Sequence, residues 1–101
     1  MITLVEIRRD RLDRRHLLLP VTRDGAAPNP SWGVDFAFVD RDAARPDAAD
    51  WTPGEWAGAD ARILVGPDGA VTPEPGVHVV WLRVDAPPEL VVEPVGLLHI
   101  T

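Results

Sequence analysis

The chain has 101 residues, 46% of them hydrophobic, and a formal net charge of −6. This length corresponds to one domain with one modest core, so we expect residues 1–101 to form a single domain. The acidic balance makes nucleic acid a poor candidate partner, and no apolar run approaches the roughly 20 residues of a membrane span. Because the chain has no cysteine, disulfides and thiolate metal sites are excluded.

Eleven prolines and eight glycines interrupt the chain at short intervals. A helix needs about ten uninterrupted residues, and few windows offer that length. The windows between these breakers are short and rich in Val, Leu, Ile, Phe and Trp. This pattern predicts an all-β fold, namely an immunoglobulin-like β-sandwich of about seven strands with Greek-key connections.

The alternation of apolar and polar residues places the strands, and Gly and Pro place the turns. Arg23-Asp24-Gly25 is expected to turn after the second strand, and Gly66-Pro67-Asp68-Gly69 after the fourth. Pro94-Val95-Gly96 predicts a bulge or kink inside the last strand. In chain order, we expect strands at residues 2–8, 16–22, 33–40, 61–65, 77–85, 90–93 and 97–101.

The remaining segments are predicted to connect these strands. Residues 40–50 form an acidic loop, residues 51–57 an irregular segment that carries two tryptophans, and residues 71–75 a crossing segment. In the strand at 33–40, Val34, Phe36 and Phe38 share one face, which we expect to point into the core. Asp35, Ala37 and Val39 lie on the opposite face.

The segment Pro75-Gly76-Val77-His78 lies where many such sandwiches have a Gly-x-Tyr corner, in which a buried Tyr bonds the backbone upstream. His78 would replace that Tyr, since an imidazole can donate one such hydrogen bond. The alternative is that His78 is an ordinary half-buried residue. Gly76 and His78, together with Phe36 and Phe38, are therefore expected to be structural residues.

The chain lacks the residues that covalent catalysis uses. It has no Cys and no Lys, and its one serine, Ser31, lies in a Pro-rich loop with no histidine nearby in sequence. The histidines at 16, 78 and 99 show no ligand spacing. The acidic loop lacks the Gly and the closing Glu of a calcium loop. We therefore expect no enzyme, no metal site and no cofactor.

The strand at 77–85 is apolar on both faces. His78, Val80, Leu82 and Val84 lie on one face, and Val77, Val79, Trp81 and Arg83 on the other. The second face must be covered, either by Trp51 and Trp56 or the acidic loop, or by a partner. The candidate interface residues are Val77, Val79, Trp81, Trp51 and Trp56.

Residues 8–15, called the basic tip below, carry five arginines against Asp10 and Asp13, whereas the rest of the chain is strongly acidic. One interpretation is a solvated strand end. The other is a tip that docks on an acidic partner or on the chain's own acidic loop.

The segments DWTPGEW, ARILVGPDG and PGVHVVWLRVDAPPELVVEPVGLLHIT make the C-terminal half similar to small proteins encoded among the virion genes of actinobacterial phages and prophages. Those proteins have Tyr where this chain has His78, so the chain departs from the pattern at the corner. The matching positions are Asp50, Trp51, Trp56, Val65, Gly66, Pro67, Pro75, Gly76, Val80, Trp81, Val84, Pro88, Gly96, Leu98, Ile100 and Thr101.

This resemblance implies a capsid-associated or head–tail structural role without catalytic residues. We therefore expect a non-enzymatic virion protein, assembled in the bacterial cytoplasm. It would attach in repeated copies to the major capsid protein as a decoration, or to neck proteins, with no nucleic acid or membrane partner. The alternative is a carbohydrate- or surface-binding module that uses its tryptophans as stacking platforms. A third possibility is a stand-alone bacterial interaction domain, for example in an injection-type particle.

Overall fold

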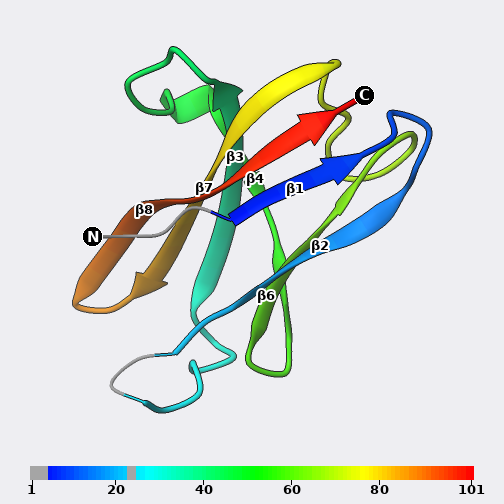
Figure 1. Cartoon of the computed structure of the whole chain (residues 1–101). Helices are drawn as coiled ribbons and strands as arrows, with labels where there is room; N and C mark the ends of the chain where they lie inside the picture. Colours follow the sequence, from blue (N-terminus) through cyan, green and yellow to red (C-terminus); the bar gives the residue numbers. More distant parts are fainter. Residues whose placement is uncertain (1–4, 23–24) are drawn as a thin grey trace.

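The computed structural model describes residues 5–22 and 25–101, which form two β-sheets packed face to face (Figure 1). The fold is all-β, as the breaker pattern predicts, and one turn of 3-10 helix, η1 (Ala48–Asp50), is present. The strands of the described residues are β1 (Val5–Arg9), β2 (Arg15–Pro20), β3 (Gly33–Asp40), β4 (Trp51–Pro53), β5 (Glu55–Ala57), β6 (Asp60–Val65), β7 (Gly76–Ala86) and β8 (Glu89–Ile100).

The two sheets differ in width. The larger has the strand order β1-β8-β7-β3-β4, and the smaller has the order β2-β6-β5. Among the named strands of the described residues, the pairings are antiparallel except that of β1 with β8, which is parallel and brings β1 beside β8 (Figure 1). Among the described strands, β7 and β8 are the longest, and they form the hairpin around which the larger sheet is built.

The predicted interruption of the last strand is a bulge within one continuous strand. Val80 pairs with Gly96 and Trp81 pairs with Pro94, so Val95 is an extra residue on β8. The side chain of Val95 packs against the core. Proline has no backbone N–H for the ladder, and its place beside a bulge fits that limitation.

Several boundaries differ from the sequence prediction. The first strand is described from Val5 onward, so the predicted residues 2–4 lie outside the described residues, as do Arg23 and Asp24 of the predicted turn. Residues 51–57 were predicted to be irregular, and this is wrong: they form β4 and β5. Short edge strands of three residues give no clear alternation, which is why the sequence pattern missed them. They also raise the strand count above the predicted seven.

Gly54 lets the chain cross from the larger sheet to the smaller one between β4 and β5. Its N–H donates to the Val34 carbonyl at 2.9 Å. A Cβ at this position would lie 2.7 Å from the Phe36 ring and 2.9 Å from the Arg62 carbonyl oxygen. The ring of Phe36 therefore packs directly against this backbone, and only glycine fits there.

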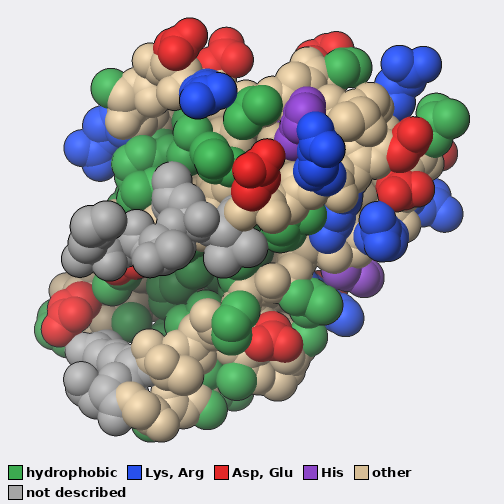
Figure 2. All heavy atoms as spheres, in the orientation of Figure 1, with side chains coloured by type: hydrophobic (Ala, Val, Ile, Leu, Met, Phe, Trp, Pro, Cys, Tyr) green, Lys and Arg blue, Asp and Glu red, His purple; other side chains and the backbone are tan. Residues whose placement is uncertain are grey.

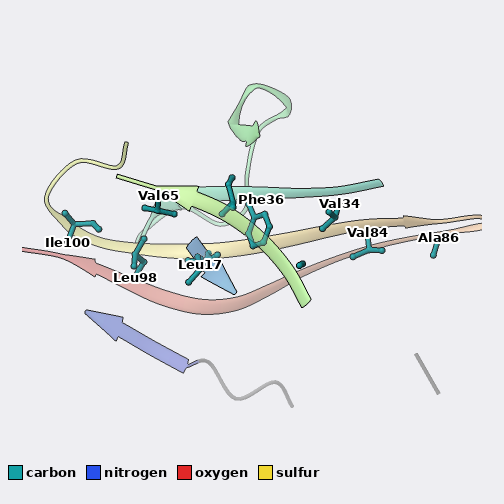
Figure 3. Packing of buried hydrophobic residues seen from close by; sticks show 11 residues of the cluster. Leu17, Val34, Phe36, Val65, Val84, Ala86, Leu98 and Ile100 are labelled. Atoms are coloured by element: carbon teal, nitrogen blue, oxygen red, sulfur yellow. The ribbon is translucent and has the colours of Figure 1, made fainter. Parts of the chain in front are cut away.

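The core lies between the two sheets and draws on both (Figure 3). Val34, Phe36 and Phe38 all contact it, which confirms the predicted inward face of β3. Phe36 is completely buried, whereas Phe38 is partly buried. The largest fully buried side chains are Phe36, Leu17, Ile63, Leu98 and Val65. In the described part of the chain, no helix is long and apolar enough to cross a membrane.

We expect Gly54→Ala to lower the free energy of unfolding by about 1–3 kcal/mol, because the added methyl group overlaps the Phe36 ring and a carbonyl. Urea denaturation measures this change. Gly33→Ala is the control, since a Cβ there meets its nearest neighbour, the Asp85 Cβ, at 3.9 Å. Equal stability of the two variants would contradict the role assigned to Gly54.

Candidate interaction surface

The candidate surface is the side of the larger sheet that faces away from the core, called the outer face below. Cross-strand partners share one face of a sheet, so the register identifies its members. Val79 pairs with Val39 and Leu97, and Trp81 pairs with Ala37 and Pro94. The apolar residues of the outer face are Val77, Val79 and Trp81 of β7, Ala37 and Val39 of β3, Trp51 and Pro53 of β4, and Leu90, Val92, Pro94 and Leu97 of β8.

A row of apolar side chains crosses the middle of this face. Ala37 pairs with Trp51 on one side and with Trp81 on the other, and Trp81 pairs in turn with Pro94. Ala37 has no exposed surface although it points away from the core. A small side chain between two indoles explains this burial. Trp51 therefore helps to cover the outer face, as one of the sequence alternatives proposed.

The indole N–H of Trp81 is a polar group within this apolar row. Its indole Nε1 is buried and has no hydrogen-bond partner among the described residues. Trp81 also lies opposite the core layer of Val80 and Leu82, as the strand alternation predicts. Leaving a buried donor without a partner costs about 1–3 kcal/mol, and most buried donors in folded proteins are paired.

An ion pair borders the apolar row. The Arg83 guanidinium donates through Nε to Asp35 Oδ2 at 3.1 Å, and its Nη2 lies 3.0 Å from the same oxygen. The same guanidinium lies 4.5 Å from the centre of the Trp51 ring, which is a cation–π contact. One face of the Trp51 ring is therefore occupied by Arg83.

Trp56 does not belong to the outer face. It lies on β5 in the smaller sheet, packs against the core, and donates its indole N–H to the Trp32 carbonyl at 2.8 Å. The prediction that Trp56 covers the same face as Trp51 is therefore wrong. The two tryptophans are five residues apart, but the chain changes sheets between them at Gly54.

His78 makes the contact predicted for the corner. Its Nε2 donates to the Glu74 carbonyl at 2.6 Å, and Glu74 lies in the predicted crossing segment. The side chain is half-buried, which is less than the substantial burial expected. Gly76, which begins β7, has a φ of +129°, a conformation that side chains other than glycine rarely adopt. It turns the chain from the crossing segment into the strand.

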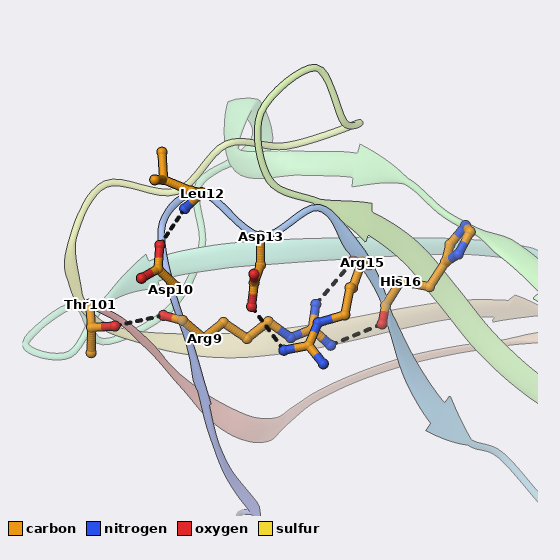
Figure 4. Close-up of polar contacts among 7 residues, drawn as sticks. All are labelled: Arg9, Asp10, Leu12, Asp13, Arg15, His16 and Thr101. Atoms are coloured by element: carbon orange, nitrogen blue, oxygen red, sulfur yellow. Dashed lines mark hydrogen bonds and ion pairs between the residues drawn. The ribbon is translucent and has the colours of Figure 1, made fainter.

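The basic tip joins β1 to β2 and is held by a set of local hydrogen bonds (Figure 4). Arg9 donates to the carbonyls of Arg15 and His16 at 3.0 and 2.9 Å, and the Thr101 hydroxyl donates to the Arg9 carbonyl. Burial lowers the pKa of the Arg9 guanidinium, Arg15 lowers it further, and Asp13 acts in the opposite direction. Arginine side chains gather at this end, with acidic side chains between them (Figure 2).

The hydroxyl and imidazole groups that could act as catalysts lie apart. Ser31 donates its hydroxyl to Asn29 Oδ1 at 2.9 Å. His78 and His99 are on opposite faces of the larger sheet, and Arg8 Nε donates to His99 Nδ1 at 3.4 Å. Within residues 5–22 and 25–101, no three His, Asp or Glu side chains are grouped as a metal site.

No protein-family model, no curated protein and no solved structure matches this chain. The function must therefore be argued from the surface itself and from the sequence resemblance.

We expect His78→Phe to lower the free energy of unfolding by about 1 kcal/mol, the net value of one hydrogen bond. His78→Tyr should be neutral or stabilising, because a phenol can donate to the same Glu74 carbonyl. Thermal and urea denaturation of both variants measure these changes. A loss above about 2 kcal/mol for the Tyr variant would contradict the corner interpretation.

Proposed function

We propose that this protein is a non-enzymatic structural component of a phage particle. In this proposal the outer face attaches it to the major capsid protein, as a decoration, or to proteins of the head–tail neck. The observation that carries the proposal is the apolar row of the outer face, with the unpartnered Trp81 indole N–H inside it. Contiguous apolar surface on a small domain is typical of a binding site, and Trp is a favoured anchor residue.

The proposal includes an immunoglobulin-like topology. In such domains, strands B, E and D lie in one sheet and strands C, F and G in the other. The orders β2-β6-β5 and β8-β7-β3 correspond to B-E-D and G-F-C. His78 lies near the start of β7, at the place of the Tyr in the corner of strand F. These correspondences support the family resemblance of the C-terminal half.

Three buried residues support the same assignment. Antibody domains have a disulfide between strands B and F, with a Trp on strand C packed against it. Here Leu17 on β2 and Val80 on β7, two residues after His78, are buried, and Phe36 lies on β3. Leu17 and Val80 border one small cavity of about 150 Å³. Aliphatic packing would replace the disulfide in a cytosolically assembled protein, where thiols stay reduced.

Repeated copies on a symmetric shell make a modest surface sufficient. Each copy needs only a weak contact if neighbouring copies reinforce it. The apolar row is narrow, but it is bordered by the Arg83–Asp35 pair, which is fixed in place. Polar groups beside an apolar centre are the usual arrangement of protein–protein interfaces, and this pair supplies them on one side of the row.

The glycan-binding alternative has less support from the geometry. Stacking on a sugar requires an accessible ring face. Arg83 occupies one face of Trp51, Trp56 packs into the core, and Trp81 is half-buried among its neighbours. The three rings therefore form no common platform.

Co-sedimentation with intact particles tests the proposed function. Particles of the phage or prophage that encodes the chain are banded in a density gradient, and the chain is quantified by mass spectrometry in the particle band. We expect many copies per particle in this band. Recovery only in the soluble fraction would overturn the proposal. A glycan array probed with the same protein tests the carbohydrate-binding alternative, which predicts specific binding to one or more glycans.

Trp81→Phe removes the unpartnered N–H and keeps an aromatic ring. This N–H is buried in the free chain, so a virion partner can accept its hydrogen bond only if docking opens the apolar row. In that case the variant should bind particles about fivefold more weakly, which corresponds to one net hydrogen bond. Trp56→Phe is the matched control, because its N–H already has the Trp32 carbonyl as partner. It should lose more stability than Trp81→Phe but keep its particle affinity. Unchanged binding by Trp81→Phe would rule out a partner for its indole N–H.

A further inference from the structure

A second feature, on the opposite face of the larger sheet from the apolar row, is an open cleft at the β7–β8 turn. Its volume is about 480 Å³, within the range of ligand sites in proteins. It lies where β2 has ended, because Pro20, Val21 and Thr22 form one wall. The inner side of the β7–β8 hairpin forms the other wall. The lining residues from the hairpin are Leu82, Val84, Ala86, Glu89, Val91, Glu93 and Val95.

This cleft, called the acidic cleft below, is apolar at its floor and acidic at its rim. Val84 and Ala86 are buried, while Val91 keeps 38% of its surface exposed. Glu89 and Glu93 both line the cleft and are exposed. Trp32 also lines the cleft and adds an aromatic side chain to its wall. A fitting occupant is therefore an apolar side chain with positive charges beside it.

The basic tip has this chemistry. Leu12 is 76% exposed, the highest value among the large exposed apolar residues of the described chain. Arg11 and Arg14 flank it in sequence, and both are exposed. Burying a leucine side chain stabilises a complex by about 1.5–3 kcal/mol, so a largely exposed one at a turn is an available anchor.

The tip is also held in one conformation before any binding. The Leu12 N–H donates to Asp10 Oδ1 at 2.8 Å, and the Asp13 N–H donates to the Asp10 carbonyl at 3.0 Å. The Arg11 N–H donates to the Thr101 carbonyl at 2.9 Å, which ties the turn to the end of the chain (Figure 4 shows the neighbouring Thr101–Arg9 contact). A preorganised turn loses little conformational entropy when it docks.

The tip and the cleft lie at opposite ends of the molecule. The tip follows Arg9, which pairs with Ile100 at the end of β8, while the cleft residues occupy the first half of β8. The twelve residues of β8, at about 3.3 Å each, cover a length comparable with the longest dimension of the molecule, 37 Å. A chain therefore cannot fill its own cleft with its own tip.

We propose that the basic tip of one copy docks in the acidic cleft of a second copy, with Leu12 on the apolar floor and Arg11 and Arg14 near Glu89 and Glu93. Different surfaces meet in such a contact, so it is heterologous and can continue from copy to copy into a ring or a filament. The contact does not use the outer face. It can therefore fail or succeed independently of the proposed attachment to a particle.

The test mixes two variants that each lack one half of the contact. Leu12→Glu removes the anchor and keeps the cleft, whereas Val91→Arg blocks the cleft and keeps the tip. Glu93→Arg is a second cleft variant on an exposed position, in case Val91→Arg disturbs folding, which circular dichroism reports. Leu18→Glu is the control, since Leu18 is 50% exposed but lies on β2 opposite Arg62, outside both surfaces.

Sedimentation velocity over a concentration series measures the mass of each sample. We expect wild type and Leu18→Glu to grow beyond dimers with concentration, and this growth to weaken with added salt. Each half-variant alone should self-associate about tenfold to a hundredfold more weakly, the equivalent of one buried leucine. An equimolar mixture of a tip variant and a cleft variant should form dimers and nothing larger.

Other outcomes overturn the proposal. A wild-type chain that stays monomeric up to about 1 mM, where even weak specific contacts form, has no such interface. Association that survives both Leu12→Glu and Glu93→Arg, or that Leu18→Glu abolishes, uses another surface. A mixture of the two half-variants that remains monomeric excludes the head-to-tail geometry.

Discussion

The fold depends on one constraint: β7 lies in the middle of the larger sheet and is apolar on both of its faces. One face supplies Val80 and Val84 to the core between the sheets. The other face carries Val77, Val79 and Trp81, which cannot also reach that core. The chain covers part of this second face by its own neighbours, and Ala37 becomes fully buried between two indoles. The neighbours bury the Trp81 N–H without giving it a hydrogen-bond partner, whereas Val77, Val79 and the Trp81 ring stay partly exposed. The proposed attachment rests on these partly exposed side chains.

The sequence predicted strand bounds, strand faces, the bulge and one short-range contact, because each depends on residues that are close together in the chain. The bounds of β3, the alternation along β7 and the bulge at Pro94-Val95-Gly96 follow from side-chain period and from the missing proline N–H. The contact of His78 with Glu74 spans only four residues, so it was also predictable. The inward orientation of Phe36 and Phe38 was predictable for the same reason, because it follows from alternation along one strand.

Contacts between distant segments were not predictable in this way. The crossing at Gly54 depends on the ring of Phe36, eighteen positions earlier in the chain, so β4 and β5 were missed and Trp56 was grouped with Trp51. The predicted placement on the face opposite the core was therefore correct for residues of β7, where the alternation of one strand decides the face. It was wrong for Trp56, whose position depends on which sheet its strand joins. The acidic cleft also has no sequence signal, because its walls come from three separate segments.

The described surface is divided into regions with different chemistry. The outer face lies along the side of the larger sheet, and the basic tip and the acidic cleft lie at its two ends. A domain with one apolar side and two complementary ends can be fixed to a shell by its side while its ends meet neighbouring copies. Carbene footprinting of the free chain and of the chain on particles tests the central claim, attachment through the outer face, most directly. The account predicts that labelling falls in the peptides containing Val77–Trp81 and Trp51, while Leu18 on the smaller sheet keeps its labelling. Unchanged labelling of Val77–Trp81, or protection confined to the smaller sheet, would contradict it.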